Sequence, residues 1–228
     1  MRIAGIIKSS LIDYHKKAST VIFLGGCNFR CGYCHNPELL TTDPGQEDIE
    51  QDDLMKFLMK RKRFIDGVCI SGGEPTLNNE LPRLIEKIKD IGLLVKLDTN
   101  GSNPAMIKRL IAENLLDYVA MDIKGPMAKY KSIAGERADT KDILLSAKIL
   151  SDAYKNDNFP CEFRTTVCKE QLDGCDLKKM ISEYPNHPPW YLQRFHNPGK
   201  ILDSDKTYSA YSADEMKALG EMLCVNVR

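Results

Sequence analysis

The sequence predicts an α/β fold, an open TIM-like partial (β/α)6 barrel whose parallel strands are joined by helical crossovers. Short apolar strand-like segments alternate with helix-like segments along the 228 residues, which is the pattern of repeated βα units. Strand segments such as 92–97 are almost continuously apolar, as expected of strands that helices cover on the outside. Six units instead of eight indicate a curved sheet that does not close, with functional groups at the carboxyl ends of the strands.

Each predicted strand is short and rich in β-branched or aromatic residues. The strands are predicted at residues 21–25, 68–71, 93–97, 118–122, 162–167 and 190–195. The helices are predicted at residues 49–63, 80–91, 104–113, 140–153, 176–184 and 213–223. In the second helix, apolar residues recur at spacings of three and four and give one apolar face. We therefore predict a single domain over residues 1–228, with an N-terminal extension (1–19), six βα units (about 20–199) and a C-terminal helical tail (about 200–228).

The composition is that of a globular protein without net charge. Hydrophobic residues make up 43% and charged residues 28% of the chain, which suffices for a full core and argues against global disorder. Lys plus Arg and Asp plus Glu both number 32, so the net charge is zero. This balance disfavours a broad surface for nucleic acid or anionic membrane, although a local basic groove remains open. No apolar run suits a membrane span or a signal peptide, so we predict a cytoplasmic protein.

The chain contains eight cysteines, and without a signal peptide they indicate a metal site or buried thiols. Cys27, Cys31 and Cys34 lie within eight residues, directly after the first predicted strand. Three thiolates in so short a loop can hold three irons of a cubane [4Fe–4S] cluster and leave the fourth iron open. Two other interpretations are a zinc site completed by His35 or a distant residue, and three unrelated core thiols.

The other five cysteines have no ligand spacing. We interpret them as unassigned or structural residues that behave as small buried hydrophobic side chains. They are Cys69, Cys161, Cys168, Cys175 and Cys224.

The CxxxCxxC spacing, with an aromatic residue before the last cysteine, resembles the radical S-adenosylmethionine (SAM) enzymes. A second element, SGGEP at residues 71–75, ends the second predicted strand. Its glycines, Gly72 and Gly73, allow a close backbone approach to a ligand, and Glu74 offers an acceptor for an ammonium group. The resemblance implies the partial barrel of the radical SAM type. It also implies that the three cysteines hold a [4Fe–4S] cluster whose open iron binds the methionine part of SAM, and that residues 72–74 hold the methionine amino group.

The longer string CNFRCGYCHNPEL at residues 27–39 resembles one branch of that family, the glycyl-radical-enzyme activases. Together with LIDY at residues 11–14, it is most similar to anaerobic ribonucleoside-triphosphate reductase activating proteins. The resemblance covers most of the chain, from about residue 5 to about residue 199.

The resemblance assigns cofactor contacts to residues at the ends of strands. Tyr33 matches an aromatic residue that contacts adenine, and packing against the loop is the simpler role. The DTNG element at residues 98–101 matches a segment beside the cofactor that contributes to a monovalent-cation site. This match places Asp98 and Asn100 near SAM, and the alternative is an ordinary Asx turn.

Three later residues receive similar assignments. Lys124, in the DIK element at residues 122–124, is expected to contact the methionine carboxylate or the substrate loop, with a surface ion pair to Asp122 as the alternative. Arg164 lies in the fifth predicted strand, where a buried arginine needs an anion or acceptors, and the resemblance places it near the cofactor. His196 matches a histidine that approaches the ribose or adenine of SAM.

Asp13 matches an aspartate that contacts the backbone of the partner's glycine loop. The chain departs from the family directly afterwards, because residues 14–17 read YHKK where the family has a Pro-Gly stretch. This departure concerns the substrate-facing edge and not the radical chemistry. Between Cys34 and Cys69 there is no ferredoxin-like insert with further cysteines.

The implied activity is that of an oxidoreductase. An electron from flavodoxin or ferredoxin reduces the cluster, SAM is cleaved to methionine and a 5′-deoxyadenosyl radical, and the radical takes hydrogen from a glycine Cα of a partner enzyme. The favoured partner is anaerobic ribonucleoside-triphosphate reductase, and pyruvate formate-lyase or another glycyl radical enzyme is an alternative. Two other classes are a radical SAM enzyme that acts on a small molecule, such as a 7-carboxy-7-deazaguanine synthase, and a zinc-binding interaction module without catalysis.

Overall fold

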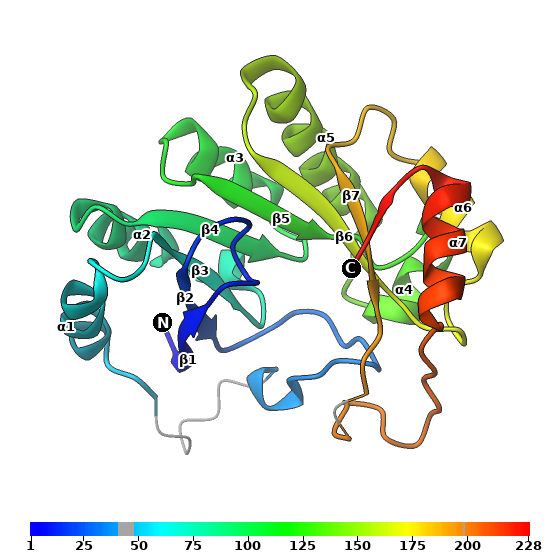
Figure 1. Ribbon diagram of the computed structural model, residues 1–228, viewed down its shortest axis with the longest axis horizontal. Coiled ribbons are helices and arrows are strands. Elements are labelled where there is room, and N and C mark those ends of the chain that lie inside the picture. The colour runs from blue at the N-terminus through cyan, green and yellow to red at the C-terminus, as the bar shows by residue number, and fades with distance from the viewer. Residues whose placement is uncertain (41–47, 198) are drawn as a thin grey trace. The chain divides into compact units, whose positions relative to one another are not determined.

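The computed structural model describes residues 1–40, 48–197 and 199–228 (Figure 1). The strands are β1 (Ile3–Ser10), β2 (Ser19–Leu24), β3 (Gly67–Gly72), β4 (Leu94–Thr99), β5 (Tyr118–Asp122), β6 (Cys161–Val167), β7 (Trp190–Arg194) and β8 (Asn226–Val227). The α-helices are α1 (Gln51–Arg61), α2 (Leu81–Asp90), α3 (Pro104–Ala112), α4 (Tyr130–Ala134), α5 (Thr140–Asp157), α6 (Gly174–Ser182) and α7 (Ala213–Leu223). Short 3-10 helices cover Pro37–Leu39, Pro75–Leu77 and Met127–Lys129. Among the described residues, no helix is long and apolar enough to cross a bilayer.

The chain folds into two compact units. Unit 1 comprises residues 1–28, 38–99 and 105–119, and unit 2 comprises residues 29–37, 100–104 and 120–228. Strand β5 begins in unit 1 and ends in unit 2. The single domain over residues 1–228 stays a prediction.

Unit 1 contains a mixed sheet in which neighbouring strands are also neighbours in sequence. Strand β1 runs antiparallel to β2, whereas β2, β3 and β4 are mutually parallel. The β3 residues 68–70 are fully buried, as expected of a parallel strand that is covered on both faces. Helix α1 packs beside α2 (Figure 1), and α2 contributes a completely buried apolar face that includes Leu84 and Ile88.

Unit 2 contains the parallel strands β6, β7 and β8. Its core includes the aromatic residues Phe163, Tyr184 and Trp190, whose ring centroids lie 5.3–6.1 Å apart. Helices α6 and α7 begin with capping boxes at Asp173 and Ser212, which satisfy N–H groups of each first turn. Helix α7 packs against α6 and β8 (Figure 1).

All six predicted strands and all six predicted helices are present; β5 and α7 have the predicted ends, and the others have shifted ends. Three elements were not predicted: β1 in the N-terminal extension, the short helix α4, and β8 in the tail that was expected to be only helical. Strand β1 gave little signal because Ile3 is its one fully buried side chain. Helix α4 has five residues and β8 has two, so neither can show a periodicity.

Candidate active site

In unit 1, the GGE segment packs against the chain that leads from β2 to Cys27. The Gly73 N–H donates to the Leu24 carbonyl oxygen at 2.8 Å, and the Glu74 N–H donates to the Gly26 carbonyl oxygen at 2.8 Å. A Cβ atom at Gly73 would lie 2.1 Å from the Gly26 carbonyl oxygen, and Gly72 has a φ of +113°. We expected these glycines to permit a close approach to a ligand. Within unit 1, the close approach is to the backbone of residues 24–26, so the glycines fix the residues just before Cys27.

The Glu74 carboxylate is fully buried at the start of the 3-10 helix Pro75–Leu77. Its Oε1 atom accepts hydrogen bonds from the Thr76 N–H at 3.1 Å, from the Thr76 hydroxyl, and from the Thr99 hydroxyl at 2.7 Å. These contacts orient the carboxylate and link the segment after β3 to the end of β4.

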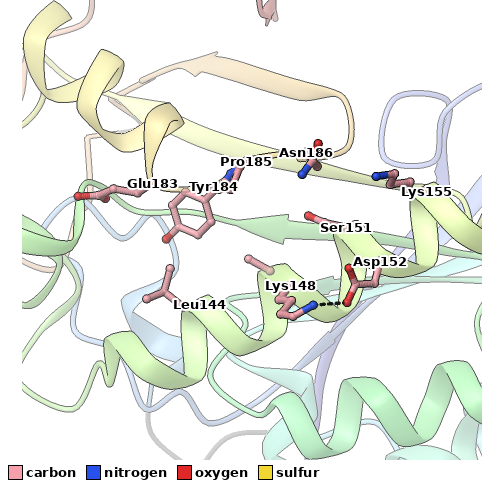
Figure 2. A pocket seen from close by; sticks show the side chains of 10 residues that line it. Leu144, Lys148, Ser151, Asp152, Lys155, Glu183, Tyr184, Pro185 and Asn186 are labelled. Atoms are coloured by element: carbon pink, nitrogen blue, oxygen red, sulfur yellow. Dashed lines mark hydrogen bonds and ion pairs between the residues drawn. The ribbon is translucent and has the colours of Figure 1, made fainter.

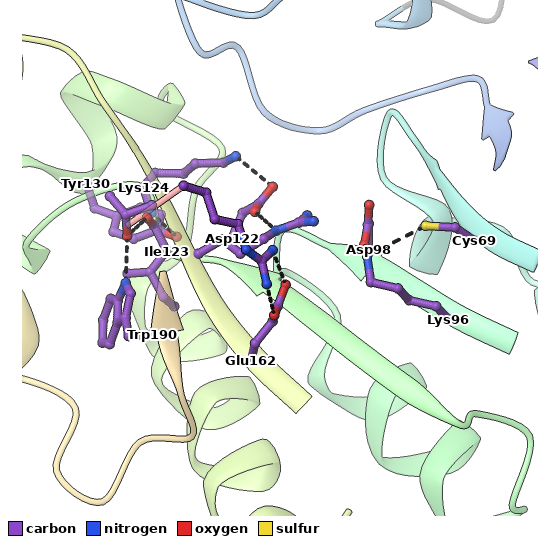
Figure 3. Close-up of polar contacts among 12 residues, drawn as sticks. Cys69, Lys96, Asp98, Asp122, Ile123, Lys124, Tyr130, Glu162 and Trp190 are labelled. Carbon is purple, nitrogen blue, oxygen red and sulfur yellow. Dashed lines mark hydrogen bonds and ion pairs between the residues drawn. The ribbon is translucent and has the colours of Figure 1, made fainter. Parts of the chain in front are cut away.

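Asp98 is paired with a lysine that we did not predict as a site residue (Figure 3). The Lys96 Nζ atom lies 2.5 Å from the Asp98 Oδ1 atom and 3.7 Å from the Cys69 Sγ atom. The side chains of Lys96 and Asp98 are only 3% and 13% exposed. One signal could have identified the pair, because a lysine and an aspartate two residues apart in an apolar strand lie on the same face.

In unit 2, Cys31 and Cys34 lie on an irregular loop that the C-terminal part of the chain holds in place. Cys31 is buried and Cys34 is half-buried, and the Cys34 N–H donates to the Cys31 carbonyl oxygen at 2.9 Å. The backbone N–H groups of Leu202 and Asp203 donate to the carbonyl oxygens of Cys34 and Gly32 at 3.2 and 2.9 Å. The sequence gave no signal for this contact, because residues 202–203 have no regular secondary structure.

The ring of Tyr33 lies in an aromatic cluster with Phe195 and Tyr208, at centroid distances of 6.1–6.4 Å. Packing against the loop is therefore part of its role. Burial raises the pKa of Tyr33 well above its usual value. Its hydroxyl group is buried and makes no hydrogen bond within the described part of the chain.

His196 is exposed and lies near His35, whose ring is 5.4 Å from that of Phe195. Burial lowers the pKa of His35, and the positive potential of His196 and of Lys124 lowers it further. The exposed position of His196 leaves it accessible to a ligand of unit 2.

Asp122 and Lys124, both labelled in Figure 3, form a partly buried cluster of charges in unit 2. Arg164 is the third member of this cluster. The Asp122 carboxylate accepts from the Arg164 Nε atom at 2.9 Å and from the Lys124 Nζ atom at 3.2 Å. Burial alone would raise the pKa of Asp122, but the two cations outweigh it and hold the pKa at about 2. Burial lowers the pKa of Lys124, and the Asp122 carboxylate reverses that effect and holds it well above the usual value. Lys124 therefore forms the ion pair with Asp122 that we gave as the alternative, although this pair is partly buried. The Asp122 carboxylate is also the anion that we expected a buried Arg164 to need.

Asn100 forms the Asx turn that we gave as an alternative for the DTNG element. Its side-chain oxygen accepts from the Ser102 N–H at 2.9 Å, and Gly101 has a φ of +78°. Asn100 is also buried, with 6% of its surface exposed.

Asp13 lies in the loop between β1 and β2. Its carboxylate accepts from the Ser10 hydroxyl, and the next residue, Tyr14, packs its ring 6.0 Å from that of Tyr118. Because Ser10 pairs with Ser19 at the first residue of β2, this loop and Cys27 lie at opposite ends of β2.

All eight cysteines belong to the described part of the chain, and none forms a disulfide bond. Cys69, Cys161 and Cys168 are buried, as predicted, and burial raises the pKa of Cys161 and Cys168 to about 12. Cys175 and Cys224 are exposed, so the interpretation as buried hydrophobic side chains is wrong for these two. Cys224 ends helix α7 in a left-handed conformation at its surface.

A cavity of about 330 Å³ lies in unit 2 between α5 and the connection from α6 to β7 (Figure 2). Lys148 and Asp152 form an ion pair of 2.6 Å at its wall, and the buried Tyr184 lines it. None of the predicted site residues lines this cavity.

The mixed α/β sheet and its parallel strands are those of the partial-barrel class. The fold is similar to that of a solved radical SAM methyltransferase from Sphaerobacter thermophilus, with a TM-score of 0.73 and 12% sequence identity over 94% of this chain and 66% of that chain. The family model of the radical SAM superfamily matches residues 21–176. The chain therefore belongs to the radical SAM superfamily and is an enzyme of that class.

Two curated relatives are similar at the level of sequence. A Methanocaldococcus jannaschii protein, named as a candidate glycyl-radical enzyme activating enzyme, is 34% identical over 96% of this chain and 90% of its own length. The pyruvate formate-lyase-activating enzyme of Clostridium pasteurianum is 33% identical over 64% of this chain and 62% of its own length.

Membership in the superfamily implies a [4Fe–4S] cluster and SAM as cofactors. The donor set fits this cluster, because three thiols at ligand spacing lie in a short loop without a disulfide. Among the described residues, no three His, Cys, Asp or Glu side chains are already arranged as a metal site. The assignment of the three thiols thus rests on their spacing and on the family.

Proposed function

We propose that the chain is a glycyl-radical-enzyme activating enzyme. The observation that carries this proposal is the CxxxCxxC string CNFRCGYCHNPEL in a radical SAM chain that resembles a candidate activase over nearly its whole length. Cys27, Cys31 and Cys34 would hold the cluster. When bound and reduced, the cluster would supply the electron that cleaves SAM, and the radical formed in this way would take a hydrogen atom from a glycine of the partner.

The remaining proposed site residues would bind and orient SAM. They are Tyr33, Gly72, Gly73, Glu74, Asp98, Asn100, Lys124, Arg164 and His196. Lys124 and Arg164 carry positive charge that suits a carboxylate, and Asp122 keeps both side chains fixed before a ligand arrives. Because these charged side chains are already held in place, less conformational entropy is lost when a ligand binds.

A monovalent cation beside residues 98–101 is part of the proposal. The ammonium group of Lys96 already lies against Asp98, so a cation there would share this carboxylate with the lysine.

The buried hydroxyl of Tyr33 would gain a hydrogen-bond partner from a bound ligand, which favours the binding of a ligand in this region of unit 2.

Asp13 would contact the backbone of the partner's glycine loop, and its hydrogen bond from Ser10 fixes the carboxylate. The favoured partner is anaerobic ribonucleoside-triphosphate reductase, on the local resemblance of residues 11–14 and 27–39. By the same resemblance, flavodoxin or ferredoxin would be the reductant. The cytoplasm is the location that we propose.

The test is an anaerobic electron paramagnetic resonance (EPR) assay of the reconstituted, reduced enzyme. SAM is added with and without the anaerobic ribonucleotide reductase of the same organism, and 5′-deoxyadenosine is measured in the same samples. A glycyl-radical doublet that requires both proteins is expected. Deoxyadenosine without the doublet would contradict this partner, and a colourless protein with one zinc per chain would contradict the radical chemistry.

A further inference from the structure

Unit 1 exposes large apolar side chains next to a run of basic residues. Leu11 and Ile12, in the loop after β1, are 79% and 88% exposed, and Phe64, after α1, is 73% exposed. Residues 60–63 read KRKR and directly precede Phe64. We call Leu11, Ile12, Lys62, Arg63 and Phe64 the basal surface, because these residues lie near the amino ends of β2 and β3.

The register of the sheet brings the two segments of this surface together. Ser10, Ser19 and Gly67 are paired across β1, β2 and β3, so the residues after Ser10 and those before Gly67 extend from the same edge. The Ala18 N–H donates to the Asp66 carboxylate at 2.8 Å, and the Asp66 N–H donates to the Ala18 carbonyl oxygen at 2.7 Å. The Arg61 guanidinium donates to the Ser9 hydroxyl. These bonds tie the two segments together, and such contacts formed before binding reduce the entropy that is lost on binding.

The basal surface is positively charged, although the whole chain has no net charge. Lys16 and Lys17 add two cations to the run at residues 60–63. Asp13 and Asp66, the carboxylates in the same two segments, are outnumbered by these six cations, so the local charge stays positive. Adjacent exposed apolar side chains with a charged rim are typical of a protein-binding surface.

We propose that the basal surface is the docking site for an acidic, partly apolar surface of the protein whose glycine is oxidised. This proposal rests on the proposed function. An electron donor suits the surface less well, because the electron itself would have to cross the length of β2, which is about 20 Å at roughly 3.3 Å per residue. A docked protein can instead reach the site with an extended loop, since about six extended residues span that distance. Nucleic acid also suits it less well, because single strands bind through stacked aromatic side chains and this surface has one phenylalanine.

Two double variants test the charge and the apolar contribution separately. With Lys62→Glu/Arg63→Glu, the Kd for the partner should rise about tenfold at low salt and less at high salt, since rim charges act through screened attraction. With Leu11→Ser/Ile12→Ser, the Kd should rise about tenfold at both salt concentrations, since apolar burial is not screened. All four side chains are exposed, so 5′-deoxyadenosine formation without partner should stay at the wild-type rate.

Matched controls make the same changes in unit 2. They are Lys178→Glu/Lys179→Glu on α6, and Leu144→Ser/Leu145→Ser on α5. Binding is measured with the cluster-loaded chain and the anaerobic ribonucleotide reductase of the same organism, or with another glycyl radical enzyme if that one gives the EPR doublet. Neither control should change the Kd more than about twofold, because surface substitutions away from an interface have small effects.

The outcomes separate this proposal from the proposed function. If the wild-type chain forms the glycyl radical and the basal variants bind the partner as tightly as the controls do, the docking site is wrong and the activase assignment stands. If the variants lose only flavodoxin-driven reduction, or only binding to a single-stranded 20-mer oligonucleotide, a different occupant is established and the proposal is overturned. A wild-type chain that forms no glycyl radical with any tested enzyme would overturn both.

Discussion

Replacing Asp122 by asparagine should destabilise the chain in a manner that depends on pH. The carboxylate has a pKa of about 2 in the folded chain, against a usual value of 3.8, because Arg164 and Lys124 bind it. This difference corresponds to about 2.4 kcal/mol of unfolding free energy at pH 7. Two cations left without their carboxylate add to the loss, so we expect a total of about 3–4 kcal/mol at pH 7, within the range for breaking a buried pair.

The direction of the pH dependence follows from the lowered pKa of Asp122. The stabilisation is fully present above the unfolded pKa of 3.8 and is lost as the pH falls through the folded value of about 2. About 1.3 kcal/mol should remain at pH 3, so the difference between wild type and Asp122→Asn should shrink by about 1 kcal/mol between pH 7 and pH 3.

Urea unfolding of the cluster-free chain, followed by circular dichroism, measures this difference at each pH. The matched control is Asp152→Asn, which removes an exposed ion pair to Lys148 and should cost at most about 0.5 kcal/mol. A loss for Asp122→Asn that equals the control, or that is the same at pH 7 and pH 3, would refute the reasoning.

Three further predictions concern the cofactor loops. Cys31→Ala should abolish 5′-deoxyadenosine formation and the brown colour of the cluster while the far-ultraviolet circular dichroism stays as in wild type; retained cleavage would contradict the cluster assignment. Gly73→Ala should cost several kcal/mol of unfolding free energy, because its Cβ would lie 2.1 Å from a backbone oxygen. The control Gly92→Ala has no heavy atom within 4 Å of its Cβ but a φ of +87°, so it should cost about 1 kcal/mol. Equal losses for the two variants would contradict the packing argument. Gly32→Ala places a Cβ 2.0 Å from the Tyr208 hydroxyl oxygen, so its cost should fall when it is combined with Tyr208→Phe, and a double-mutant cycle without coupling would count against this contact.

The fold was largely predictable because its main elements show strong local patterns. Helix α2 has a complete apolar face, and β3 is buried over residues 68–70, so period and composition agree there. Strand β1 escaped prediction because its side chains are mostly exposed or half-buried, and its pairing to β2 compensates for the weak pattern. Tertiary pairing of this kind leaves little trace in a local window of sequence.

The candidate site also has features that the sequence predicts and features that it does not. The spacing of Cys27, Cys31 and Cys34 is local, so the sequence alone suggests a cluster. The partner of Arg164 could not be read from the sequence, because Asp122 lies 42 residues away and the pair depends on which strands are neighbours. Lys96 was readable in principle from its spacing to Asp98, but a lysine in an apolar strand is ordinarily interpreted as an exposed edge residue.

Each unit pairs the charged groups at the ends of its strands before any ligand is bound. In unit 1, Lys96 neutralises Asp98 and two threonines orient Glu74. In unit 2, Arg164 and Lys124 share Asp122. A primary carbon radical abstracts hydrogen from most nearby C–H bonds, so an enzyme that generates one must enclose it with its target, and charges in an enclosed site are tolerated only when they are paired. These pairs therefore do two things: they stabilise the fold, and they hold charged groups in fixed orientations where burial weakens their solvation.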